Sequence, residues 1–116
     1  MSPGFGSGMG RASGPARHER PEIDELALTA ARAADKLVSA ARERSVTRWL
    51  AYFEPLPDDL RDAPIIELRR IAMRARAAYG PKDSIRDVLP PAVTEPLLDA
   101  IDRLLKGLSK REMHGG

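Results

Sequence analysis

The 116-residue sequence contains no cysteine and only two histidines, the side chains that most often carry nucleophilic, redox and metal chemistry. Without cysteine there are no disulfides, thiolate ligands or thiol nucleophiles, and a reducing compartment such as the cytoplasm is the expected location. His18 and His114 lie in glycine-rich or polar terminal segments, where an imidazole is not held in a fixed geometry. We therefore expect no enzymatic activity, no metal site and no cofactor.

Long apolar runs and aromatic residues are also scarce. No apolar stretch approaches the roughly 20 residues that cross a bilayer, so no membrane contact is expected. Aromatic residues make up 4% of the chain and are not interleaved with basic residues, as a stacking platform for single-stranded nucleic acid requires. Because no segment alternates apolar and polar residues, the sequence predicts no β-strand.

What the sequence does contain is a series of segments with helical periodicity. Pro21, followed by acidic residues, marks the start of a first helix, and its alanine-rich stripe allows a neighbouring helix to approach closely. The apolar phase changes near Ser45, which predicts a kink or a new helix, and Pro55 and Pro57 end that region. We predict an all-α protein, a small bundle of four to five helices with a disordered N-terminal tail.

The chain has room for one small domain. Residues 1–20 are rich in glycine, serine and proline and offer little to bury, which predicts a disordered tail. Residues 21–108 form the predicted helical domain and residues 109–116 a polar C-terminal tail. Asp83 or Ser84 is predicted to cap a short helix that ends near Val88. The last helix is predicted to begin at Thr94 as its cap, with Pro96 in its first turn, and to end at Gly107. A core this small gains stability from association with another chain.

Paired carboxylates are the remaining candidates for acid–base chemistry or magnesium binding. Asp58 and Asp59 are predicted in a proline-bounded loop, where they cap the helix that starts near Pro64. Asp99 and Asp102 are predicted opposite a leucine stripe, on a solvated helix face. Capping and solvation explain both pairs, so neither is assigned a catalytic role.

The segment Pro64–Tyr79 combines a core-forming stripe with the most basic surface of the chain. Ile66 and Met73 form a second apolar stripe on the other side of the arginines. A helix that is apolar on two sides usually lies between two neighbours. The segment Arg69–Arg86 carries six basic side chains against one acidic side chain, a net charge of +5.

Two interpretations of this charge stay open. Arg70 and Arg74, one turn apart and away from the core stripe, can contact an acidic partner such as a phosphate backbone. Alternatively, the arginines pair with the chain's own acidic segments, one of which, Glu54–Glu67, carries a net charge of −4. Glu95 and Asp99 place negative charge where the recognition helix of a helix-turn-helix faces phosphates, which counts against that motif.

These observations favour a non-enzymatic interaction protein, an adaptor or regulatory subunit that binds a protein partner through a helix face and charge complementarity. A nucleic-acid-binding regulator that uses the basic helix around Arg69–Arg76 is the alternative, and homo-oligomerisation also stays open. The residues predicted to bind the partner are Arg44, Arg48, Trp49, Arg70 and Arg74. For Trp49 a place in the core is the stronger interpretation, because the domain has few large side chains to bury.

Overall fold

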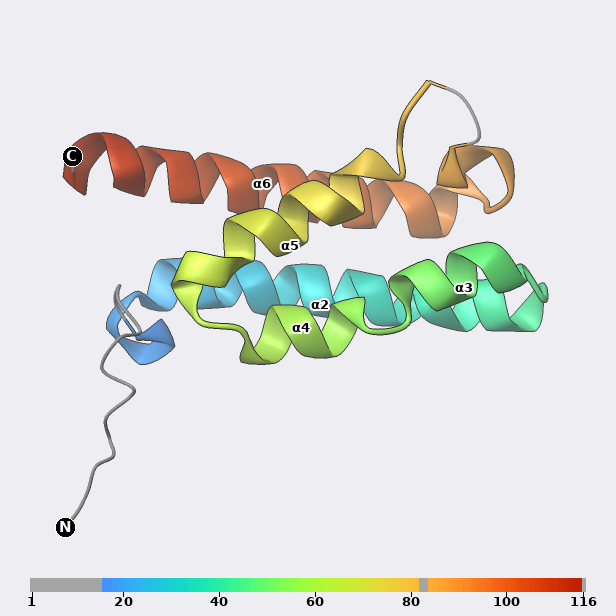
Figure 1. Ribbon diagram of the computed structural model, residues 1–116, viewed down its shortest axis with the longest axis horizontal. Coiled ribbons are helices and arrows are strands. Elements are labelled where there is room, and N and C mark those ends of the chain that lie inside the picture. Colours follow the sequence, from blue (N-terminus) through green and yellow to red (C-terminus); the bar gives the residue numbers. More distant parts are fainter. Residues whose placement is uncertain (1–15, 82–83, 116) are drawn as a thin grey trace, which may run out of the picture.

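The computed structural model describes residues 16–81 and 84–115, with side chains through residue 110 (Figure 1). These residues form helices and turns, and no strand occurs among them, which confirms the all-α prediction. The elements in chain order are the 3-10 turn η2 (Arg17–Glu19), α2 (Pro21–Glu43), α3 (Thr47–Phe53), α4 (Leu56–Asp62), α5 (Ile65–Ala77), the 3-10 turn η3 (Ile85–Asp87) and α6 (Pro91–Gly115). Most of the tail predicted for residues 1–20 lies outside the described residues. None of the described helices has the length and hydropathy that a bilayer crossing requires.

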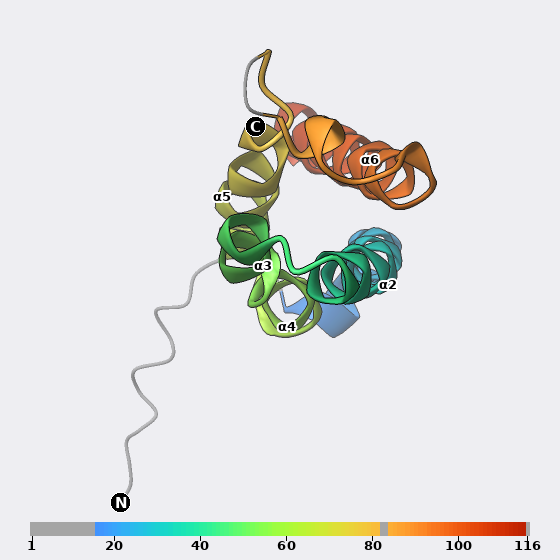
Figure 2. The same cartoon turned by 90° about the vertical axis from the view of Figure 1, so that its right-hand side faces the viewer.

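The two longest helices, α2 and α6, run antiparallel along the length of the molecule, and α3, α4 and α5 lie on one side of this pair (Figures 1 and 2). The alanine stripe of α2 is fully buried at Ala27, Ala30 and Ala34, and both α4 and α6 pack against this helix. Small side chains there allow close helix approach, as the sequence predicts. The largest side chain with no exposed surface is Phe53, at the end of α3.

α2 and α6 are in close contact where Gly107 faces the first turns of α2. A Cβ atom added to Gly107 would lie 2.8 Å from Leu26 Cδ1 and 3.4 Å from Ile23 Cδ1. The predicted end of the last helix at Gly107 is wrong, because this glycine provides room for a helix contact and α6 continues through it to Gly115. Residues 109–115, predicted as part of a polar tail, belong to α6.

The central helices are separated from one another at prolines and at one residue with a strained backbone. Ser45 has a φ of 56°, in the left-handed region, and α3 begins at Thr47, which confirms the predicted break. Asp58 and Asp59, predicted in a loop, instead lie in the first turn of α4. Proline is compatible with the first positions of a helix, where the N–H groups have no intrahelical acceptor, so Pro57 lies in the first turn of α4 rather than excluding a helix there. No side chain caps α5, which corrects the predicted aspartate cap.

The last helix begins one turn earlier than the sequence predicts. Pro91 is its first residue, so Thr94 is a buried residue inside α6 and not its cap. The Thr94 hydroxyl donates to the carbonyl oxygen of Pro90 at 3.3 Å. As a result Pro96, expected in the first turn, lies inside the helix. The predicted cap at Ser84 is confirmed, since its hydroxyl accepts from the Arg86 amide at 3.0 Å and starts η3.

Candidate partner-binding surface

α5 has one side in the core and one side on the surface of the molecule. The buried residues of this helix are Leu68, Ile71, Ala72 and Ala75. On the outer side Ile66 is 57% exposed and Met73 is 52% exposed, seven residues and two turns apart. Among the described residues nothing covers these two side chains. α5 does contact α6 and α4, but the prediction that a neighbour covers its second apolar stripe is wrong among the described residues.

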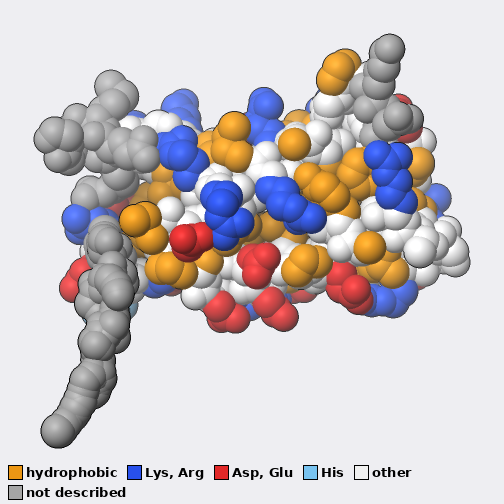
Figure 3. Space-filling model, viewed as in Figure 1, with side chains coloured by type: hydrophobic (Ala, Val, Ile, Leu, Met, Phe, Trp, Pro, Cys, Tyr) orange, Lys and Arg blue, Asp and Glu red, His pale blue; other side chains and the backbone are white. Residues whose placement is uncertain are grey.

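Arg70 lies between Ile66 and Met73 on the same side of α5. Its side chain is 70% exposed, and its Nη2 lies 2.5 Å from Glu67 Oε1, in an ion pair between residues three apart. Ile66, Arg70 and Met73 together are called the α5 surface below. Figure 3 shows basic side chains gathered over this helix, with apolar side chains beside them. The α5 surface combines exposed apolar area with a cation at its centre.

Other arginines of the basic segment are also paired within the chain. Arg76 Nε lies 2.6 Å from Asp102 Oδ1, and Arg69 donates to the Ser109 hydroxyl at 3.2 Å. The interpretation that the arginines pair with the chain's own acidic segments is confirmed for Arg70 and Arg76. The net charge of the segment therefore overstates the charge that it presents to a partner.

Arg74, also predicted to bind the partner, joins α5 to α3. Its Nη1 donates to the Tyr52 carbonyl oxygen at 3.1 Å, and the Tyr52 hydroxyl donates to the Arg74 carbonyl oxygen at 2.6 Å. The guanidinium carbon of Arg74 lies 4.0 Å from the centre of the Tyr52 ring, within cation–π distance. The structure thus assigns Arg74 a role in holding two helices together.

The remaining predicted residues lie at the far end of the molecule from the start of α5. Arg48 stacks over Trp49 at 4.8 Å, and the Trp49 ring meets the Tyr52 ring edge to face at 5.4 Å. Trp49 is 7% exposed and belongs to the core cluster, so little of its side chain remains for a partner. Arg44 is exposed at the C-cap of α2. Tyr52, which the sequence reasoning missed, connects Arg48 and Trp49 to Arg74.

Arg86 in η3 is joined to Glu95 in α6. Two charge-assisted hydrogen bonds of 2.8 Å join them, and this bonding lowers the pKa of Glu95 and raises that of Arg86. The pair stabilises the fold at pH values above the usual pKa of a glutamate. This stabilisation is lost as the pH falls through the lowered pKa that Glu95 has in the folded state. Burial raises the pKa of Tyr79, whose hydroxyl donates to the Thr94 carbonyl oxygen at 2.6 Å. A phenol held in this way is suited to structure rather than to proton transfer.

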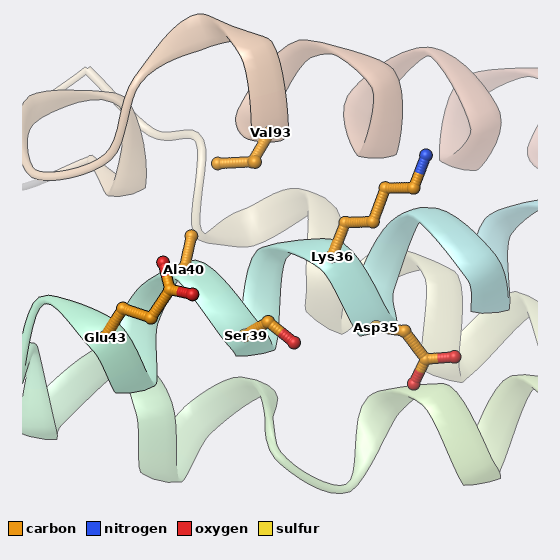
Figure 4. A pocket seen from close by; sticks show the side chains of 6 residues that line it. All are labelled: Asp35, Lys36, Ser39, Ala40, Glu43 and Val93. Carbon is orange, nitrogen blue, oxygen red and sulfur yellow. The ribbon is translucent and has the colours of Figure 1, made fainter.

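An open depression of about 370 Å³ lies between α2 and α6 (Figure 4). It is lined by Asp35, Lys36, Ser39, Ala40, Glu43 and Val93. Lys36 points toward α6, whereas Asp35 points toward α4, where its carboxylate pairs with Arg61. The polar side chains diverge, so they do not form a binding constellation.

Three of the four aspartates considered from the sequence pair with arginines. Asp58 pairs with Arg61 at 3.1 Å, Asp99 with Arg103 at 3.0 Å and Asp102 with Arg76 at 2.6 Å. In the described part of the chain no three His, Cys, Asp or Glu side chains come together in a group that would hold a metal ion. The α5 surface is therefore the candidate site with the clearest physical basis.

No family model, curated protein or solved structure matches this chain.

Charge reversal at the two predicted arginines of α5 is expected to have different effects on folding. Arg74→Glu removes the hydrogen bond and cation–π contact to Tyr52, and we expect a loss of about 1–2 kcal/mol in the free energy of unfolding. Arg70→Glu removes one exposed ion pair, and we expect a loss below about 1 kcal/mol. Urea denaturation followed by circular dichroism measures both. Equal losses would contradict the assigned roles, and Arg70→Glu is the variant suited to binding experiments.

Proposed function

We propose that this chain is a non-enzymatic interaction protein, an adaptor or regulatory subunit that binds a protein partner through the α5 surface. The observation that carries the proposal is the exposure of Ile66 and Met73, at 57% and 52%, on one side of a helix whose other side is in the core. Exposed apolar residues at helical spacing, with an arginine between them, resemble the anchors of helix-mediated protein contacts.

The energetics of the small domain also support a protein partner. Covering two large apolar side chains removes surface that water disfavours, at about 25 cal/mol for each Å² of apolar area. Arg70 adds a charge that favours an acidic counterpart and makes recognition directional. Nucleic-acid binding remains the alternative, but it has less support because a phosphate backbone offers no apolar surface to cover the exposed side chains of Ile66 and Met73.

Affinity capture from the protein's own cell lysate tests this proposal. The tagged full chain is compared with the double variant Ile66→Gln/Met73→Gln, at low salt, with and without nuclease. We expect a stoichiometric, nuclease-resistant protein with the native chain and at least tenfold less of it with the double variant, because the apolar anchors are lost. The matched control is Val88→Gln, which changes a 42% exposed apolar side chain outside α5.

Three outcomes count against the proposal. Retention that depends on nuclease would favour the nucleic-acid alternative, with the basic helix as its binding element. Equal retention by the native chain and the double variant would remove the α5 surface from the interface. An equal loss with Val88→Gln would mean that general surface hydrophobicity, and not α5, holds the captured protein.

A further inference from the structure

The α5 surface lies beside a row of carboxylates on the same face of the molecule. In Figure 3 the basic side chains over α5 are followed, toward the edge formed by α4, by acidic side chains. The three acidic residues of α4, Asp58, Asp59 and Asp62, are exposed, opposite the side of the helix that is buried in the core. One face thus carries a basic and apolar row next to an acidic row.

The charges of these two rows are not fully compensated within the chain. Asp58 is held by Arg61, but Asp59 and Asp62 have no ion-pair partner among the described residues. Arg70 has only its neighbour Glu67, one turn away on the same exposed helix. Exposed pairs of this kind contribute little, so Arg70 is available to a second carboxylate.

We propose that the α5 surface binds the α4 carboxylates of a second copy of this chain, in a two-fold symmetric dimer. This inference rests on the proposed function, because it takes the α5 surface as a protein-binding site and names its partner. A two-fold axis in the contact plane, running between α4 and α5, places α5 of each copy over α4 of the other. Arg70 of one copy then faces Asp59 and Asp62 of the second copy, and the same contact occurs twice.

Symmetry explains why a second copy fits this face better than other occupants. A two-fold axis in the same contact plane, but running across the two rows, would place arginine over arginine and aspartate over aspartate. Like-charge repulsion disfavours that arrangement. A phosphate backbone laid along α5 would meet the carboxylates of α4 beside it. In the proposed dimer, by contrast, each row meets its opposite charge and α4 of the second copy covers Ile66 and Met73.

Sedimentation of the purified full chain over a range of concentrations tests the dimer. We expect a monomer–dimer equilibrium with a Kd below roughly 1 mM at low salt, which weakens as salt screens the exposed charges. Arg70→Glu and Asp62→Lys are each expected to raise the Kd at least tenfold, because two attractive contacts become repulsive ones. Circular dichroism of every variant checks that the helices remain folded.

A mixture of the two variants gives the sharpest result. Within the chain Arg70 and Asp62 do not pair with each other, so charge reversal at both sites can compensate only between copies. In a mixed dimer Glu at position 70 faces Lys at position 62, and the unchanged Arg70 faces the unchanged Asp62. We expect the equimolar mixture to dimerise within about threefold of the native Kd although neither variant does so alone.

Matched controls and contrary outcomes complete the experiment. Arg103→Glu and Asp99→Lys alter a comparably exposed ion pair on α6 and are expected to leave the Kd unchanged. A native chain that stays monomeric, or a mixture that fails to dimerise, overturns the second copy as the partner. If a lysate protein is then still captured through Ile66 and Met73, the proposed function stands without the dimer; if neither binds, both proposals fail.

Discussion

Phe53→Ala is expected to remove about 3–5 kcal/mol from the free energy of unfolding, the largest loss from a single substitution that we predict for this chain. Phe53 has no exposed surface and is the largest side chain buried to this degree. Its ring meets the rings of Tyr52 at 5.1 Å and Trp49 at 6.1 Å, so truncation leaves a cavity and removes two aromatic contacts. Domains of this size are stable by only about 5–15 kcal/mol, so this loss is a large share of the total stability.

Urea denaturation at several temperatures measures this loss, with Phe53→Leu as the matched control. Leucine keeps most of the buried volume, and we expect it to cost less than about 1.5 kcal/mol. A loss below about 1 kcal/mol for Phe53→Ala would contradict the burial of this ring. It would also contradict the packing of α3 against the rest of the core, since Trp49 and Phe53 are the buried residues of that helix.

The elements that local sequence signals define were predictable. Pro21 starts α2, Ser45 breaks it and Ser84 caps η3, each through a backbone preference or a hydrogen bond within a few residues. Gly107 shows the limit of such reasoning. A glycine after a helical segment is typical of a helix cap. Here the absence of a side chain instead leaves room for Leu26, about 80 residues away in the sequence. Only the three-dimensional packing distinguishes the two uses.

The candidate site was predictable in part. The apolar pair Ile66 and Met73 is visible in the sequence, but periodicity alone does not tell whether a neighbour covers it. Arg70 and Arg74 look equivalent, one turn apart, until the structure shows that Tyr52 engages one of them and not the other. The contact depends on where α3 lies relative to α5, which follows from the tertiary fold and not from spacing along the chain.

Pro96→Ala is expected to stabilise the protein, which distinguishes the observed start of α6 from the start that the sequence predicts. Pro96 is exposed and lies at the sixth position of α6, where proline lacks the N–H that would bond to the Ala92 carbonyl and its ring crowds that oxygen. Alanine restores the bond, and because proline also restricts the unfolded chain, we expect a net gain of about 2 kcal/mol. The midpoint of thermal unfolding should rise by about 10 °C.

Pro91→Ala is the matched control, because it makes the same change at the first position of the same helix. Proline is well suited to that position, where no N–H bond is lost, so alanine should leave stability unchanged within about 0.5 kcal/mol or lower it slightly. If α6 began at Thr94 instead, Pro96 would lie in the first turn and the two substitutions would have similar, small effects. A gain at Pro96 without one at Pro91 therefore requires the helix to extend through Pro91, which places Thr94 inside α6, with its hydroxyl within hydrogen-bond distance of the Pro90 carbonyl oxygen and of Glu95 Oε2.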